Sequence, residues 1–211
     1  MAFLKVLLTL LISVGLVLFW IGFTAKLNEW LKKYKMSSLL YLNVLIASFP
    51  FLFIAQLLLG LYPIKSLGSS ALFMIVIIIT VLAAMLDGLK HNEAKHGGDL
   101  LGWCMEGMLM EIPQRMLMQY FIFMLLQTLA VSNAAYYAIL CNACVWCLAI
   151  YIKNRMLKSQ TNKDLFYELL ASFIFSIGIG AIYQYNGFIL IAMIAHGTER
   201  FVSNWLISLR D

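Results

Sequence analysis

Charged residues are scarce in this sequence. Asp, Glu, Lys and Arg make up only 12% of its 211 residues, whereas 63% are hydrophobic, and the mean hydropathy is +0.90. Soluble domains are about a quarter charged and roughly half apolar, so this composition excludes an ordinary soluble domain. We therefore expect lipid to surround most of the chain, and we predict an all-α fold, a polytopic bundle of transmembrane helices.

The cysteines have no neighbouring residues in the sequence that could complete a metal site. Cys141, Cys144 and Cys147 fall at steps of three inside one apolar run that contains no histidine or carboxylate. A zinc site needs thiolates clustered with further ligands, so we interpret these cysteines as packing residues and expect neither a metal nor another cofactor. The net charge of +5 does not indicate a nucleic-acid partner, because the basic residues lie between apolar runs, as in the loops of membrane proteins.

Seven apolar runs cover nearly the whole chain, and each is long enough to cross a bilayer. They are residues 2–23, 39–61, 67–86, 100–131, 134–152, 165–185 and 187–209. Since one span needs about 20 residues, we expect a single transmembrane domain over residues 1–211, with no room for a soluble domain. The first run is longer than the apolar part of a signal peptide and no small-residue cleavage site follows it, so we expect a retained span.

The basic residues indicate an orientation. When the connections between runs are assigned alternately to the two sides, only Lys5 and Lys65 fall on one of them. By the positive-inside rule the opposite side is cytoplasmic, which places the N-terminus outside and the C-terminus in the cytoplasm of a plasma-membrane protein. The residues on the cytoplasmic side are Lys26, Lys32, Lys33, Lys35, Lys90, Lys95, Lys153, Arg155, Lys158, Lys163 and Arg210.

Several charged residues lie inside the apolar runs. Glu111 and Arg115 are four residues apart in the 100–131 run, and His196, Glu199 and Arg200 share one helical face of the 187–209 run. A charge at the bilayer centre costs at least about 2.5–3.5 kcal/mol, so these side chains should face one another or a wet cavity rather than lipid. The spacing therefore predicts that the two runs touch near the middle of the membrane.

Two interpretations of this cluster remain open. In the first, it is an ion-pair network that only fixes helix packing, with Glu106 or Glu111 paired to Arg200. The same network would pair Glu199 with Arg115. In the second, a carboxylate and an imidazole handle a proton or a water molecule, as ionisable groups inside membranes often do.

Pro113 lies inside the 100–131 run, which is longer than one span requires. Proline has no backbone N–H and removes one helical hydrogen bond. We therefore expect a kink beside Glu111.

The residues around Glu111 and His196 resemble the motifs of the CAAX protease and bacteriocin-processing family of intramembrane endopeptidases, also called the Abi family. The first motif of that family is EExxxR. Here Glu111 and Arg115 match its second Glu and its Arg, and Met110 replaces the first Glu. The third motif is HxxxN, in which His196 matches and Arg200 replaces the Asn. The resemblance covers the second half of the chain, about residues 100–209.

The second motif of the family, FxxxH, would fall near Trp146 and Ile150, where this sequence has no histidine. The resemblance implies that the first Glu and the second-motif His activate a water molecule, while the third-motif His and Asn stabilise the oxyanion. Met110 and Ile150 cannot accept a proton, although Glu106, one turn before Met110, offers a displaced carboxylate. We therefore expect a family member whose peptidase chemistry is lost or altered.

The leading hypothesis is a protein that holds a membrane-associated peptide or protein in a polar cavity around Glu111, Arg115, His196 and Arg200. One alternative is an active intramembrane peptidase with Glu106 or Glu111 as base, assisted by the histidine and Arg200. Another is a small proton-coupled transporter, although the sequence has no matched pair of Gly- or Pro-broken half-spans. Membrane lipids are the other expected partner, and the oligomeric state is left open.

Overall fold

The computed structural model describes residues 2–34, 42–44, 46–50, 53, 70–91, 93–157 and 160–210. All regular secondary structure in these ranges is helical, which confirms the predicted all-α class. The 39–61 run lies largely outside the described residues, as do Lys35, Lys65 and Lys158 of the charge sorting.

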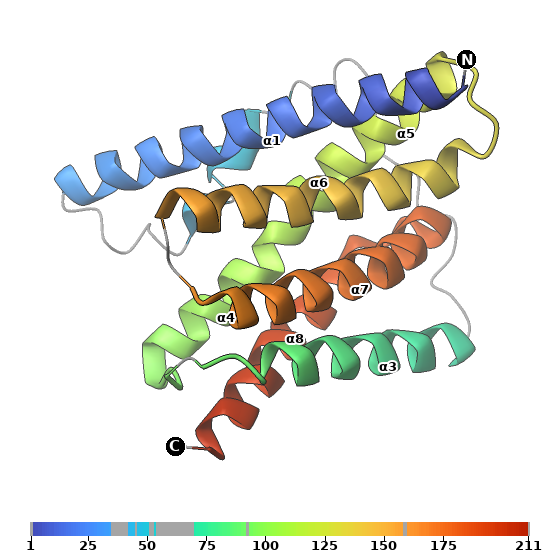
Figure 1. Cartoon of the computed structure of the whole chain (residues 1–211). Helices are drawn as coiled ribbons and strands as arrows, with labels where there is room; N and C mark the ends of the chain where they lie inside the picture. The colour runs from blue at the N-terminus through green and yellow to red at the C-terminus, as the bar shows by residue number, and fades with distance from the viewer. Residues whose placement is uncertain are drawn as a thin grey trace.

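The other predicted runs coincide with helices to within a few residues. The exception is the first, because its helix continues well beyond residue 23. The elements are α1 (Ala2–Lys33), α3 (Ser70–Asp87), α4 (Gly97–Glu111), η2 (Ile112–Gln119), α5 (Tyr120–Thr128), α6 (Ala134–Leu157), α7 (Asn162–Asn186) and α8 (Ile189–Ser208) (Figure 1).

Three of the described helices are long and apolar enough to cross a membrane, namely α1, α6 and α7, and α3 is a shorter apolar helix. Large apolar side chains on α1 face outward: Phe3 is 80% exposed, Leu11 62% and Phe19 64%. Such a surface would be costly in water and is typical of a helix in contact with lipid. The fold therefore supports a membrane protein.

Neighbouring helices pack in a row, and one long helix crosses them. α1 lies along α6, α6 packs on α7, α7 on α3, α3 on α8, and α8 on α4 (Figure 1). The continuous helix formed by α4, η2 and α5 contacts α8 at its beginning and α6 and α1 at its end. One hydrophobic core, around Ile122 and Val145, joins α1, α5 and α6, and a second, around Ile179 and Ala192, joins α3, α7 and α8.

The long helix changes geometry directly after Glu111. Its η2 segment is π-helical, and the Tyr120 N–H bonds the Arg115 carbonyl five residues earlier. Pro113, which has no N–H to donate, lies in the first turn of this segment. The irregularity expected beside Glu111 thus takes the form of a widened helical turn, whose buried residues include Arg115 and Gln119.

A tight turn between α7 and α8 sets the position of the last helix. Gly187 ends α7 with φ +75°, a left-handed conformation that favours glycine, and its N–H bonds the Tyr183 carbonyl at 2.8 Å. The Asn186 side chain accepts a hydrogen bond from the Phe188 N–H at 2.8 Å. This turn reverses the chain, so that α8 runs back past α7 and α3 toward α4.

Candidate functional site

Glu111 is the centre of a buried polar network. It is the last residue of α4 and is 0% exposed. Its Oε2 accepts a hydrogen bond from Arg115 Nε at 2.8 Å, and its Oε1 lies 2.7 Å from His196 Nδ1. Because an ionised carboxylate can only accept, we assign the hydrogen to Nδ1 of the imidazole. The predicted meeting of the 100–131 and 187–209 runs is confirmed by this contact.

Arg115 carries the network from η2 to α7. Its side chain is 0% exposed, and Nη1 donates to Gln119 Oε1 at 3.1 Å and to the Ser176 carbonyl at 3.2 Å. The remaining nitrogen, Nη2, has no hydrogen-bond partner within the part of the chain that the structure describes. The guanidinium therefore balances the Glu111 carboxylate inside the protein, without help from solvent.

Gln119 extends the network along α7. Its Nε2 donates to the Gly180 carbonyl at 2.8 Å and to Gln184 Oε1 at 3.0 Å, and Asn142 Nδ2 of α6 lies 3.5 Å from its Oε1. The approach depends on Gly180, because a Cβ there would lie 2.9 Å from Gln119 Oε1 and 3.0 Å from Arg115 Nη1. A continuous line of polar side chains thus runs from α8 through η2 to α7.

Arg200 lies on the cavity side of this network. Its Nη1 donates to the Trp103 carbonyl at 2.6 Å and lies 3.4 Å from Glu106 Oε2, while its guanidinium stacks over the Trp103 ring at 5.3 Å. The Arg200 side chain is 17% exposed and that of Glu106 is 49% exposed. The predicted pairing of Glu106 with Arg200 is confirmed, and it joins α4 to α8.

The predicted pair of Glu199 with Arg115 is wrong. The Arg115 guanidinium is bonded to Glu111 and to groups of η2 and α7, so it does not face the acidic residue on α8. Glu199 instead lines the cavity near Asp87 and Glu168, whose carboxylates repel it, and near Lys90, whose ammonium attracts it. Helix α8 packs on α4 at one side and on α3 at another, and Glu199 is on the side of α3.

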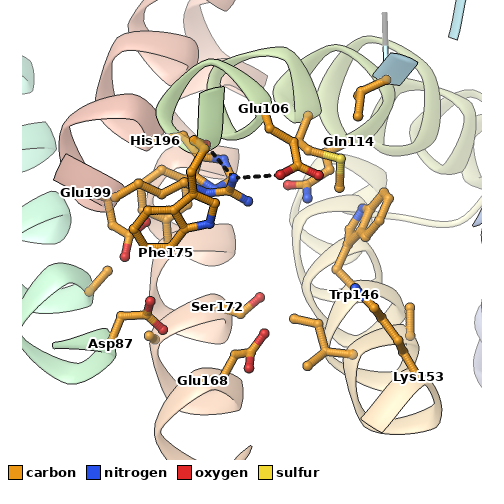
Figure 2. Close-up of a pocket in the computed structure, with 18 of the residues that line it drawn as sticks. Asp87, Glu106, Gln114, Trp146, Lys153, Glu168, Ser172, Phe175, His196 and Glu199 are labelled. Atoms are coloured by element: carbon orange, nitrogen blue, oxygen red, sulfur yellow. Dashed lines mark hydrogen bonds and ion pairs between the residues drawn. The ribbon is translucent and has the colours of Figure 1, made fainter. Parts of the chain in front are cut away.

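The His196 imidazole lines a cavity of about 910 Å³. His196, Arg200 and Glu106 line it, and α1, α3, α6 and α7 supply other parts of its wall (Figure 2). Glu111 and Arg115 lie behind this lining, fully buried. His196 Nδ1 points back to Glu111, and its Nε2 has no hydrogen-bond partner among the described residues. The five residues predicted from the sequence are thus brought together, three of them at the cavity and two behind it.

Besides Arg200, three positions at which the sequence departs from the motifs that it resembles also line this cavity. They are Met110 on α4, and Trp146 and Ile150 on α6. The first and last of them stand where the resemblance expects the catalytic Glu and the second-motif His. A thioether and an alkyl group cannot take a proton from water at these positions.

A second charged group, which was not predicted from the sequence, lines the same cavity. Lys90 Nζ lies 2.7 Å from Asp87 Oδ1 and 3.8 Å from Glu168 Oε2, and all three residues line the cavity together with Glu199. Asp87 and Glu168 lie near the ends of apolar runs, where a charge ordinarily meets water. A signal did exist, because the end of α3, the beginning of α7 and the end of α8 fall on the same predicted side of the membrane.

The described residues offer no metal-binding group, since no three His, Cys, Asp or Glu side chains among them are placed to hold an ion. Cys141 is buried and Cys147 packs on α7, with its Sγ 3.6 Å from the Leu169 carbonyl. Comparisons with known protein families, with curated proteins and with solved structures find no match to this chain. The functional argument therefore depends on the geometry of the site.

Proposed function

We propose that this chain is a multi-pass plasma-membrane protein with the architecture of the CAAX protease and bacteriocin-processing family, and that it holds a membrane-associated peptide in its cavity without cutting it. In this proposal the chain crosses the bilayer about seven times, with the N-terminus outside. The apolar helices α1, α6 and α7 and the one-sided distribution of basic residues support the topology.

This orientation makes the cavity accessible from the cytoplasm. The loop between α3 and α4 lines it with Lys90, His91 and Glu93, and the end of α6 contributes Lys153. All of these residues belong to connections assigned to the cytoplasmic side. His196 marks the deep end, within the bundle, so a peptide chain entering from the cytoplasm would reach the imidazole.

The sealed state of Glu111 is the observation on which the proposal depends. Both of its oxygens are engaged, by Arg115 and by His196, and the side chain is 0% exposed. A general base must reach the water that it activates, and this carboxylate cannot do so without breaking both contacts. The free Nε2 of His196 and the Arg200 guanidinium can still bind a peptide carbonyl or carboxylate. The geometry thus favours binding over hydrolysis.

The test uses the purified chain in lipid nanodiscs, incubated with a random peptide library and analysed by mass spectrometry for retained peptides and for cleavage products. We expect retention of intact peptides, lowered by His196→Ala and by Arg200→Met. His96→Ala and Arg155→Met are the matched controls, because these residues are exposed and lie outside the cavity. Retention no greater than that of empty nanodiscs would refute the proposal.

A second candidate, an active peptidase, is favoured by the position of Glu106. This carboxylate is half-exposed, lies one turn before Met110 on α4, and lines the cavity beside Arg200 and His196. It could accept a proton from water, while the imidazole and the guanidinium face the developing oxyanion. Cleavage products that disappear in both Glu106→Gln and His196→Ala, but persist in Glu93→Gln, would establish this function instead.

A further inference from the structure

The wall of the cavity that begins one turn after His196 carries carboxylates from three different helices. Asp87 comes from α3, Glu168 from α7 and Glu199 from α8, and Figure 2 shows all three among the residues that line the cavity. Lys90, in the loop after α3, is the only ammonium paired with any of them in the described ranges. We refer to Asp87, Lys90, Glu168 and Glu199 as the basal cluster.

The one ammonium of the basal cluster is shared by two carboxylates. Lys90 is 7% exposed at its side chain, with Nζ close to Asp87 and farther from Glu168. Glu168 also accepts a hydrogen bond from the Gln160 amide, which carries no charge. The cluster therefore contains three carboxylates against a single positive charge, in a largely buried setting.

Glu199 is the carboxylate left without a partner. The residue is 7% exposed and makes no hydrogen bond or ion pair with any residue that the structure describes. The adjacent Arg200 is directed to Trp103 and Glu106, and Lys153 on the opposite wall forms no ion pair in the same ranges. Lys90 and Arg200 attract Glu199 only from a distance, so a cation brought into the cavity could form the direct contact that this carboxylate lacks among the described residues.

The geometry favours an organic cation over a metal ion. The described side chains do not bring three ligand groups to one point, as a metal requires. An ammonium or guanidinium accepts a looser arrangement, because its several N–H groups can donate to separate carboxylates. An anionic group would be repelled by the excess negative charge of the basal cluster.

We infer that the basal cluster is a binding subsite for the basic side chain, lysine or arginine, of the peptide that the cavity holds. This inference rests on the proposed function and adds a chemical preference to it. The basic side chain would lie against Glu199, while a neighbouring carbonyl or carboxylate of the same peptide reaches His196 and Arg200, one turn or less away on α8. The peptide would occupy the cavity that Glu199, His196 and Arg200 line together.

The test repeats the peptide-retention experiment with full-length chain in nanodiscs of neutral phosphatidylcholine, and it compares the composition of the retained peptides with that of the input library. We expect peptides with Lys or Arg to be enriched roughly tenfold on the wild type, as one charge-assisted contact would give. Glu199→Gln should reduce this enrichment to nearly none while intact peptides are still retained. Glu199 has no partner to lose, so the variant should fold normally.

Glu93→Gln is the matched control, because it removes one negative charge from an exposed residue that also lines the cavity. The inference fails, and the proposed function survives, if wild type retains peptides without basic enrichment or if Glu199→Gln keeps the enrichment. It also fails if the enrichment disappears in nanodiscs of phosphatidylethanolamine, since the ammonium would then come from a lipid headgroup. Absence of any retained peptide overturns both proposals.

Discussion

Glu111 lies behind the wall of the cavity and Glu199 lines it, and each is less than one-tenth exposed. Glu111 has an arginine on one oxygen and a histidine on the other, and Arg115 is held in turn by Gln119 and by α7. Glu199 has no such partner among the described residues. The same chemical group is thus paired by the protein behind the cavity wall and left without a direct partner where it faces the cavity.

The difference suggests that the charge of Glu111 stabilises the fold, whereas the charge of Glu199 is free to contact a ligand. Burying an ion pair contributes little net stability, but removing one member of the pair leaves the other uncompensated at high cost. We therefore expect substitutions of Glu111 and its partners to affect folding, and substitution of Glu199 to affect ligand binding with little loss of stability.

The largest effect is expected for Arg115→Met. It leaves the Glu111 carboxylate buried with only the imidazole as partner, and it removes the bonds to Gln119 and Ser176. We expect a loss of about 3–5 kcal/mol in the free energy of unfolding, measured by denaturant titration in detergent micelles. Arg155→Met, at an exposed position of α6, is the control, and an equal effect of the two changes would contradict the comparison.

Glu111→Gln should have the next largest effect. The amide keeps the shape but loses the charge that Arg115 and His196 contact, so we expect a loss of roughly 2–3 kcal/mol in the same assay. In the double variant with Arg115→Met no isolated charge is left behind. Its loss should therefore be smaller than the sum of the two single losses, and strict additivity would show that the pair is not coupled.

Gly180→Ala tests how tightly the network lies against α7. The added methyl group would crowd Gln119 Oε1 and Arg115 Nη1, both within 3.0 Å of its position, so we expect a loss of about 1–3 kcal/mol. Gly22→Ala on α1 is the control, because a Cβ there has nothing within 4 Å. The measurement is the midpoint temperature of thermal unfolding of the two variants. Equal midpoints would mean that the network can shift to accommodate the methyl group without loss of stability.

The smallest change in stability is expected for Glu199→Gln. Neutralising a buried carboxylate that has no direct partner removes a desolvated charge, so the free energy of unfolding should stay the same or rise by about 1 kcal/mol. The same denaturant titration measures it. A loss as large as that of Glu111→Gln would reveal a structural role for Glu199 and would remove the contrast between the two carboxylates.

The polar network around Glu111 was largely predictable from the sequence. A spacing of four residues puts Glu111 and Arg115 on one helical face, and the high cost of charge in lipid requires a partner for His196 and its neighbours. The contribution of Gln119 was not predictable, because an amide gives no charge signal and its partner on α7 is the backbone carbonyl of Gly180. Spacing along one helix does not show which neighbouring helix a side chain will face.

The basal cluster was less predictable for a related reason. Glu199 was recognised as an interior charge, but its predicted pairing with Arg115 was wrong. Sequence spacing shows which face of α8 carries Glu199, but it does not show which neighbouring helix that face contacts. Asp87 and Glu168 lie near the ends of their helices, where charged residues are ordinary and carry little information about a site. Only the packing of α3, α7 and α8 brings them to one cavity.

The π-helical segment after Glu111 acts as a rotational spacer. Each residue of an α-helix turns the chain by about 100°, so deleting one residue from Ile112–Gln119 to restore α-helical pitch would swing everything that follows by that angle. Gln119 would then point away from Gly180, and α5 would present a different face to α6. A single-residue deletion here would therefore rotate the side chains of the following part of η2 and of α5 about the helix axis, while leaving the hydrophobicity of the helix nearly unchanged.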